Sequence, residues 1–376
     1  MELDKYRASL DAWLEQHLSA LQPDHAGLGS LDDQMEQLAK VKRLTFEADW
    51  MRWGWPERVG GLGGSILLRS YLGEALTALD LVEPGLYSMT EVLAPTMIDY
   101  ATPELAAVMV PRLLSGEETW CQGFSEPGTG SNLAALTCRA TRDGAVWRVS
   151  GQKVWTSLAQ YAQRCVLLTR TGSPGSAHKG ITALFVDMES PGIEVRPIET
   201  MHGAPEFSEV FFDDVVVPLD RTLGDEGHGW SVAMDLLPFE RSTALWHRAA
   251  HLHVRLQHLL DIAPADSIDP SDLGEVTQLV YALRARSRST QYRLAAGEKL
   301  GPETSIDKVL VASAEQAVFD LVADSLGAVL ALGDDPENIR WRREYLYSRA
   351  ATIYGGTVEI QRNIIARRLL DLGTGS

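Results

Sequence analysis

The β-rich middle of the chain begins with the segment Trp120-Cys-Gln-Gly-Phe-Ser-Glu-Pro-Gly-Thr-Gly-Ser-Asn132. It opens with residues typical of a strand and continues into a turn that carries the hydroxyl side chains of Ser125, Thr129 and Ser131. Hydroxyls and unhindered backbone N–H groups in such a turn can hold the edge of a planar heteroaromatic ring or a phosphate. Taken alone, the segment is equally consistent with an ordinary turn.

A second segment, Gly151-Gln-Lys-Val-Trp-Thr-Ser157, supports the ligand interpretation. Trp155 and Ser157 lie two residues apart, so in a strand their side chains share one face. The indole can then stack on a ring while the hydroxyl forms a hydrogen bond with it. The two segments together predict a pocket for a flat polar cofactor.

The hydrophobic period changes twice around these segments. Residues 1 to 117 show mostly helical spacing, as in 31–53 and 66–81. Short strands bounded by turn residues follow at 146–149, 165–169, 181–186, 193–198 and 209–212. Helical spacing returns at 229–260, 272–299, 305–332 and 337–370, with a polar break at Ala263–Pro270. Strands between two helical regions predict an α+β fold and argue against a doubly wound dinucleotide-binding sheet.

Composition restricts the class of protein. The 376 residues carry a formal net charge of -17, which argues against general nucleic-acid binding because no basic footprint is present. Cys121, Cys138 and Cys165 form no CxxC pair and are typical of reduced thiols in a cytoplasmic protein. The N-terminus lacks the pattern of an export signal, and no apolar run reaches the ~18 residues of a membrane span. We therefore expect a cytoplasmic protein that does not bind a membrane.

Other candidate sites have weaker support. The run Gly60–Gly64 lacks the Lys-Ser/Thr of a phosphate-binding loop and indicates a turn between helices. His247, His251 and His253 lie along one helical stretch, but no Glu or Cys completes a metal-ligand set, so we expect no metal site. The absence of a Gly-x-Ser-x-Gly motif leaves a serine hydrolase with little support.

In an ordered set of segments that spans nearly the whole chain, the sequence resembles the acyl-CoA dehydrogenase family of flavoproteins. These segments are Gly54–Glu57, Phe124–Ser131, Gly151–Ser157, Phe211–Pro218, Leu223–Trp230 and Tyr354–Arg362. The resemblance implies non-covalently bound FAD, an acyl-CoA substrate and an electron-transfer flavoprotein as acceptor. It also implies an N-terminal helical domain (1–117), a middle β-barrel-like domain (118–225) and a C-terminal four-helix bundle (226–376).

The resemblance also assigns roles to individual residues. It implies flavin contacts for Gln122, Phe124, Ser125, Ser131, Trp155, Ser157, Tyr354, Thr357 and Glu359, and substrate contacts for Ser131, Arg241 and Gly355. Within that set, Trp155 would cover the flavin ring and Ser157 would bond near its reactive nitrogen.

The implied reaction is an α,β-dehydrogenation, in which a carboxylate removes the α-proton of the thioester and the β-hydride passes to the flavin. Many family members carry this base directly after the tyrosine of the C-terminal turn, but here that position is Gly355. A minority use a glutamate followed by arginine on the first long helix of the C-terminal domain, and Glu240 and Arg241 match that pair. The apolar neighbours of Glu240 favour a raised carboxyl pKa, as a base requires. We therefore predict that Glu240 is the base, against the alternative of a surface glutamate paired with arginine.

Two departures from the family concern assembly. Family homotetramers complete each flavin site with an Arg, a Phe and a Gln-x-x-Gly-Gly turn of a neighbouring subunit, where this chain has Ala263–Pro270 and Asp324–Ala328. An acid near a pyrophosphate would repel it. The pattern resembles bacterial heteromeric enzymes that act on CoA thioesters of steroid side chains, so we expect a hetero-oligomer, and otherwise a homo-oligomer. A non-catalytic partner subunit and an oxygen-using flavoprotein remain alternatives.

Overall fold

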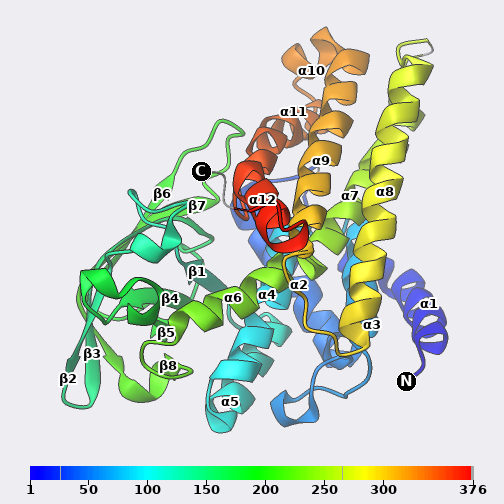
Figure 1. The fold of residues 1–376 in the computed structure, drawn as a ribbon. Coiled ribbons are helices and arrows are strands. Elements are labelled where there is room, and N and C mark those ends of the chain that lie inside the picture. The colour runs from blue at the N-terminus through cyan, green and yellow to red at the C-terminus, as the bar shows by residue number, and fades with distance from the viewer. Residues whose placement is uncertain (26, 265, 374–376) are drawn as a thin grey trace.

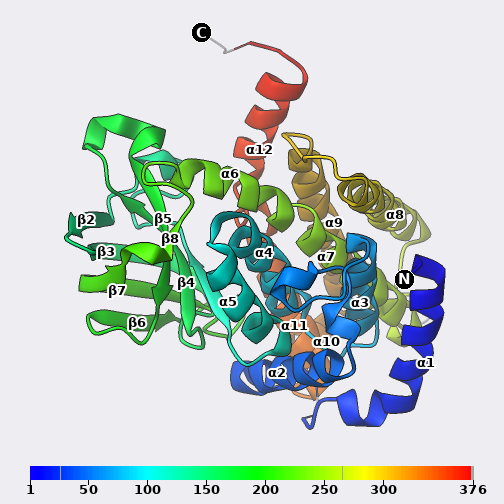
Figure 2. The ribbon, with the colours of Figure 1, turned by 90° about the horizontal axis from the view of Figure 1, so that it is seen from below.

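The computed structural model describes residues 1–25, 27–264 and 266–373. A β-sheet forms one side of the molecule and a bundle of long helices forms the other (Figure 1). Helices α4 and α6 lie between the two, in the view of Figure 1 and in the view turned by 90° (Figure 2). The predicted α+β arrangement of helices, strands and helices is therefore confirmed.

The N-terminal region consists of helices with well-defined starts. They are α1 (Leu3–Leu21), α2 (Leu31–Glu47), α3 (Ile66–Ala78), α4 (Pro84–Tyr100) and α5 (Pro103–Ser115). Helix α2 begins with a capping box, in which Ser30 Oγ accepts from Asp33 N at 3.1 Å and the Asp33 carboxylate accepts from Ser30 N at 2.8 Å. Thr102 caps α5 in a similar way by accepting from Leu105 N.

The middle region is one mixed sheet with strand order β6-β7-β3-β2-β4-β5-β8, and β1 pairs with β4 in parallel. The strands are β1 (Trp120–Gly123), β2 (Arg139–Asp143), β3 (Val146–Ser157), β4 (Arg164–Arg170), β5 (Ile181–Asp187), β6 (Ile193–Ile198), β7 (Phe207–Pro218) and β8 (Thr222–Leu223). Alternation along β4 divides the sheet between two cores. Cys165 and Leu167 pack into the core of the middle region, whereas Val166 and Leu168 pack against the N-terminal helices.

The C-terminal region contains α6 (Gly229–Glu240), α7 (Thr243–Ile262), α8 (Pro270–Ala295), α9 (Thr304–Leu326), α10 (Ala328–Leu332), α11 (Pro336–Ser348) and α12 (Val358–Ile364), followed by a π-helical turn (Ile365–Leu369). Helices α7, α8, α9 and α11 share one hydrophobic core that includes Leu252, Val280, Phe319 and Trp341. This is the predicted four-helix bundle. Helix α6 lies outside it and packs on α4 and β5.

Three helices predicted in the C-terminal region are broken into shorter elements. The predicted helix 229–260 is interrupted at Ser242, whose backbone is non-helical at φ -131° and ψ -78°. Gly327, at φ 52° and ψ -126°, separates α9 from α10 within the predicted helix 305–332. The predicted helix 337–370 is broken by a 3-10 turn at Arg349–Thr352 and by positive φ at Gly355. The predicted polar break at 263–270 joins α7 to α8, although its residue 265 lies outside the described residues.

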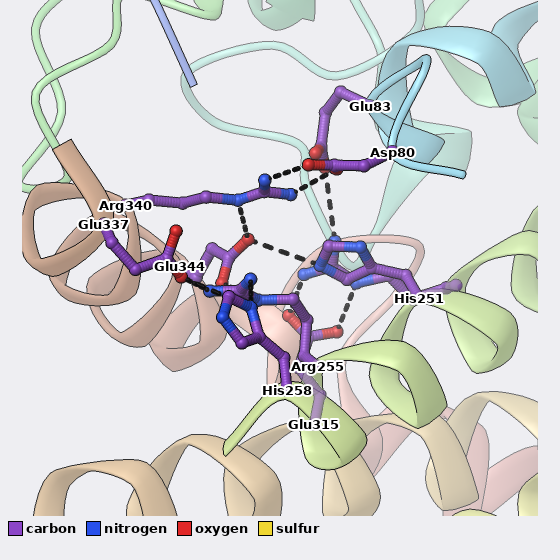
Figure 3. A network of polar contacts seen from close by, with 10 residues as sticks. Asp80, Glu83, His251, Arg255, His258, Glu315, Glu337, Arg340 and Glu344 are labelled. Carbon is purple, nitrogen blue, oxygen red and sulfur yellow. Dashed lines mark hydrogen bonds and ion pairs between the residues drawn. The ribbon is translucent and has the colours of Figure 1, made fainter. Parts of the chain in front are cut away.

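Ion pairs join the bundle to the N-terminal helices (Figure 3). On α11, Arg340 binds Asp80 in the segment after α3 and also donates to Glu344 at 3.0 Å. Glu344 in turn accepts from Arg255 of α7 at 2.8 Å. Arg340, Glu344 and Arg255 are all less than 9% exposed. The network therefore fixes how α7 and α11 lie against each other and against the first region.

Candidate active site

Glu240 occupies the last position of α6, because the chain leaves the helical path at Ser242. Its carboxyl group lies close to three other segments: β1, α9 and the turn before α12. Burial raises the pKa of the Glu240 carboxyl, while the charges of Arg241 and Lys308 and a hydrogen bond with Gln122 oppose this rise. A carboxylate with a raised pKa is suited to accept a proton near neutral pH.

Gly355 lies directly against this carboxylate. A Cβ atom added to Gly355 would lie 2.9 Å from Glu240 Oε1. Gly355 also has φ +63°, in the left-handed region that favours glycine. Glu240 therefore reaches the place from which a side chain at position 355 would begin.

Hydrogen bonds hold the glycine turn in place. Arg241 Nε donates to Gly355 O at 3.3 Å, and Gln361 Nε2 donates to Gly355 O at 3.1 Å and to Gly356 O at 3.3 Å. A Cβ on Gly356 would approach Gln361 Nε2 to 2.6 Å, so a larger residue would displace this donor. The glycine turn is thus hydrogen-bonded both to Arg241, the residue after Glu240, and to Gln361 of α12.

A buried ion pair joins the two segments from which the cofactor pocket was predicted. Lys153 Nζ donates to Glu126 Oε1 at 2.8 Å and to Phe124 O at 3.1 Å. The backbone adds a bond from Val154 N to Ser125 O at 3.0 Å. Lys153 is 0% and Glu126 5% exposed, so the pair is shielded from solvent. It keeps the turn after β1 beside the end of β3.

Trp155 has an unusual conformation for a residue in a strand. Its φ is 59°, at an irregularity in the pairing of β3 with β7 between Lys153 and Thr156. The indole is 58% exposed and meets Phe207 edge to face, with the ring centroids 6.1 Å apart. Ser157, half-buried, pairs with Phe207 in the same ladder. The bulge thus leaves a large aromatic surface uncovered by the chain.

Several polar atoms around these segments are available to a ligand. Thr129 Oγ1, Thr156 Oγ1 and Gln361 Oε1 are buried and have no hydrogen-bond partner within the part of the chain that is described. Gly128 and Gly130 have open space where a Cβ would lie. Buried polar groups normally find partners, and open glycine backbone can approach phosphate oxygens. These residues fit the flavin dinucleotide that the sequence predicts.

The site residues predicted from the sequence fall into groups. Gln122, Glu240, Arg241, Gly355 and Tyr354 lie around one space, as the contacts of Glu240, Gly355 and Lys308 show. Phe124 and Ser125 are joined to the end of β3 as described above.

Three other predicted residues are exposed or make local contacts, and Tyr354 of the first group has a further hydrogen bond. Ser131 is exposed in the turn after β1, and Glu359 is exposed in the first turn of α12. Thr357 caps α12, with its Oγ1 accepting from Ile360 N at 3.3 Å. Tyr354 donates its hydroxyl to Glu315 at 2.9 Å, and Glu315 is also bound by Arg248 at 2.6 Å.

Sequence reasoning missed Lys308, Glu315 and Gln361. Lys308 and Glu315 are 1% and 0% exposed on α9, two turns apart on its buried face. Their positions follow the apolar phase of the helix, with Val311 and Ala312 between them. The sequence signal for Lys308 and Glu315 was a charged side chain at a position where the apolar pattern of the helix predicts burial.

The cysteines and histidines form no further site. Cys121, Cys138 and Cys165 are free and buried. His247 hydrogen-bonds with Ser88 Oγ at 3.1 Å, whereas the rings of His251 and His253 lie near Glu344 and Tyr281. Across residues 1–25, 27–264 and 266–373, no group of three His, Cys, Asp or Glu side chains could hold a metal ion. In the same described ranges, no helix is long and apolar enough to cross a membrane.

Family models match this chain in three consecutive parts. They describe the acyl-CoA dehydrogenase N-terminal domain over residues 2–117, the middle domain over 121–215 and the C-terminal domain over 227–370. The chain is 36% identical to acyl-CoA dehydrogenase IpdE1 of Mycobacterium tuberculosis over 382 aligned residues, which cover 99% of this chain and 98% of the relative.

Two solved structures are similar over nearly their full length. One is the Tcur3481-Tcur3483 steroid ACAD, at 25% identity and a TM-score of 0.82, covering 99% of this chain and 97% of that one. The other is the ChsE4-ChsE5 complex from Mycobacterium tuberculosis, at 27% identity and a TM-score of 0.76, covering 99% and 98%.

Proposed function

This chain belongs to the acyl-CoA dehydrogenase family, and from that premise we propose that it oxidises the Cα–Cβ bond of an acyl-CoA to a 2-enoyl-CoA with Glu240 as the base. The family consists of FAD-dependent oxidoreductases that act on CH–CH bonds. Bound FAD supplies the acceptor for the β-hydride. The work of the polypeptide is then to bind the thioester, orient it and remove the α-proton.

The observation that carries the proposal is the approach of Glu240 to Gly355. Its Oε1 lies 2.9 Å from where a Gly355 Cβ would begin, at the position that holds the base in many family members. A carboxylate from α6 can therefore serve the same space. Burial, which raises its pKa, makes it a stronger base than an exposed glutamate.

The other residues divide between the cofactor and the substrate. We assign the flavin to Gln122, Phe124, Ser125, Ser131, Trp155, Ser157, Tyr354, Thr357 and Glu359, and the thioester side to Ser131, Arg241 and Gly355. The exposed Trp155 indole and the unpaired Thr129 and Thr156 hydroxyls support the flavin assignment.

Substitution of the base tests this function. Glu240→Gln preserves the shape of the side chain but removes its basicity, so turnover should fall by at least about 100-fold while flavin content is unchanged. Flavin absorbance and dye-coupled oxidation of acyl-CoA measure the two quantities. Glu47→Gln is a matched control, because Glu47 also ends a helix but is exposed on α2. Undiminished turnover in Glu240→Gln would rule out this base.

We further propose a hetero-oligomer that acts on a steroid-derived acyl-CoA. The similar structures are named as a steroid ACAD and as a complex of ChsE4 with ChsE5. On this chain, the exposed Asp324 is followed by Val329 and Leu332, which are 54% and 81% exposed. An exposed acid followed along the chain by uncovered apolar side chains suits contact with a different subunit better than completion of a flavin site by a second copy.

Co-expression with a second member of the same family tests the assembly. The expected result is a stable complex with more flavin per chain than this chain binds alone, and activity with an electron-transfer flavoprotein as acceptor. Full flavin occupancy and activity of the isolated chain would contradict the hetero-oligomer. Parallel assays with oxygen and with a dye separate the dehydrogenase from an oxygen-using flavoprotein. A complex whose activity survives Glu240→Gln would identify this chain as a non-catalytic subunit.

A further inference from the structure

Lys308 is a buried cation next to the proposed base. It lies on α9 and is 1% exposed. No carboxylate of the described residues comes within 4.0 Å of its ammonium group. A buried, unpaired ammonium is costly, and a methionine would fill the same volume without that cost. The presence of a buried positive charge at position 308 therefore suggests that the charge has a function.

The contacts of Lys308 fix the segment that leads into the glycine turn. Its Nζ donates to Ala351 O at 2.5 Å and lies 4.0 Å from the centroid of the Tyr354 ring. The first contact is with a residue of the 3-10 turn Arg349–Thr352, and the second is a cation–π interaction with the residue before Gly355. Lys308 thereby holds both residues against α9.

Lys308 and Glu240 approach the same point from two helices. A Cβ on Gly355 would lie 2.9 Å from Glu240 Oε1 and 3.3 Å from Lys308 Cε. Glycine is the residue type that leaves this point free. The stem of the lysine and the carboxylate of the glutamate are therefore near neighbours, with no other side chain built from position 355 between them.

The other charged groups around Lys308 and Glu240 already have partners. The groups that act on Lys308 are Glu240 of α6, Arg241 after α6, Arg248 of α7 and Glu315 of α9. Arg248 and Glu315 form an ion pair at 2.6 Å, and Arg241 donates to Gly355 O. Burial lowers the pKa of Lys308 to about 8, although the charges of Glu315 and Glu240 oppose this fall. The charge of Lys308 remains available to Glu240.

We propose that Lys308 is a positioning residue for the base: it fixes the Tyr354–Gly355 turn beside Glu240, and its ammonium group stabilises the Glu240 carboxylate. The inference rests on the proposed role of Glu240. It explains why a cation is buried near the acid that must be ionised before it accepts a proton.

The pH dependence of kcat/KM tests this role. Lys308→Met removes the charge and the hydrogen bond, whereas Lys308→Gln removes the charge but keeps a donor for Ala351 O. Both should move the acid limb of the profile to higher pH, with a loss of about 10-fold on that limb and a smaller loss above it. Lys5→Met, on the exposed face of α1, is the control and should leave the limb in place. An unmoved limb in folded, flavin-containing Lys308→Gln would overturn the proposal.

A double-mutant cycle provides a readout that needs no substrate. Chemical denaturation gives the free energy of unfolding of wild type, Lys308→Met, Glu240→Gln and the double variant. Lys308→Met should be less harmful when Glu240 has already become neutral, because the partner of the charge is then gone. Additive effects would contradict the interaction. If no acyl-CoA were oxidised by the wild-type holoenzyme, the proposed function would fail while this coupling could still be observed.

Discussion

Single residues show what the sequence could and could not reveal about the site. The sequence predicts Glu240 as the base because the resemblance directs attention to a Glu-Arg pair once position 355 is glycine. Its closeness to Gly355 follows from the end of α6 and the break at Ser242. Lys308 was not predictable from its residue type, because a lone lysine in an amphipathic helix is usually exposed. Its place in the apolar phase of α9 indicates burial, but its closeness to Gly355 depends on how α9 packs against the glycine turn.

The shared point beside Gly355 allows an exchange of carboxylates. In the double variant Glu240→Gly with Gly355→Glu, the acid begins from the other backbone position and reaches the same space. We expect kcat/KM at least about 10-fold above that of Glu240→Gly, but below wild type, because a non-glycine residue at φ +63° costs about 1–2 kcal/mol. Steady-state kinetics on variants with equal flavin content measure the effect.

The companion single variant serves as the control. Gly355→Glu alone places two carboxylates close together, which raises the pKa of one of them. Its acid limb should therefore extend to higher pH than that of wild type. A double variant no more active than Glu240→Gly would show that a carboxylate at position 355 does not reach the space that the Glu240 carboxylate occupies.

At the scale of elements, periodicity located most helices but not their ends. The apolar spacing continues through Ser242 and through Gly355, whereas the backbone does not. The missed strand β2 buries only Ala140, so it lacks the alternation from which strands are recognised. The missed strand β8 has two residues, Thr222 and Leu223. Such elements form because neighbouring strands offer partners, which is tertiary information.

The network between α7 and α11 predicts a large loss of stability from one uncharged substitution. Glu344 is 7% exposed and binds both Arg255 and Arg340. Glu344→Gln leaves these guanidinium groups without full compensation, so the free energy of unfolding should fall by about 3–5 kcal/mol. Glu337→Gln on the same helix is the control, since its 36% exposed side chain should contribute less than about 1 kcal/mol. Urea denaturation of both variants checks the difference.

The same carboxylate makes the effect depend on pH. Burial opposes the ionisation of Glu344, but the charges of Arg255 and Arg340 outweigh burial and lower its pKa. A lowered pKa contributes stability above the unfolded value of about 4.3 and loses it as pH falls through the folded value. The difference between wild type and Glu344→Gln should therefore be constant from pH 6 to 8 and shrink below pH 4. A difference that does not shrink on acidification would exclude this carboxylate as its source.

At the scale of the whole molecule, one sheet belongs to two cores. Phe185 of β5 packs against Trp120, with the ring centroids 4.9 Å apart, in the core shared with the N-terminal helices and α6. Its neighbour Val186 points into the core of the middle region. The hydrophobic periodicity predicted the three regions of the sequence, but not that two of them share a core. The residue pattern of a strand can show that both of its faces are buried, but it does not show which elements cover each face.

Adjacent substitutions on β5 should therefore loosen different parts of the molecule. Phe185→Ala, which should cost about 3–5 kcal/mol, is expected to speed hydrogen exchange in α4 and α6 as well as in the sheet. Val186→Ala should speed exchange in β3 and β7 and leave α4 protected. Hydrogen–deuterium exchange read by mass spectrometry distinguishes the two patterns. Equal patterns would show that the sheet transmits disturbance to both cores alike.

The glycine turn has a consequence for how such proteins can change over generations. If an acid on α6 and an acid at position 355 reach one place, as the carboxylate exchange tests, a lineage can gain the second glutamate before it loses the first. Between the two events both acids would share one proton, and the proposed base would be kept at every step. The first acid could then be lost without an inactive intermediate. A glycine at the position equivalent to residue 355 is therefore as consistent with a base that has moved to α6 as with a base that has been lost.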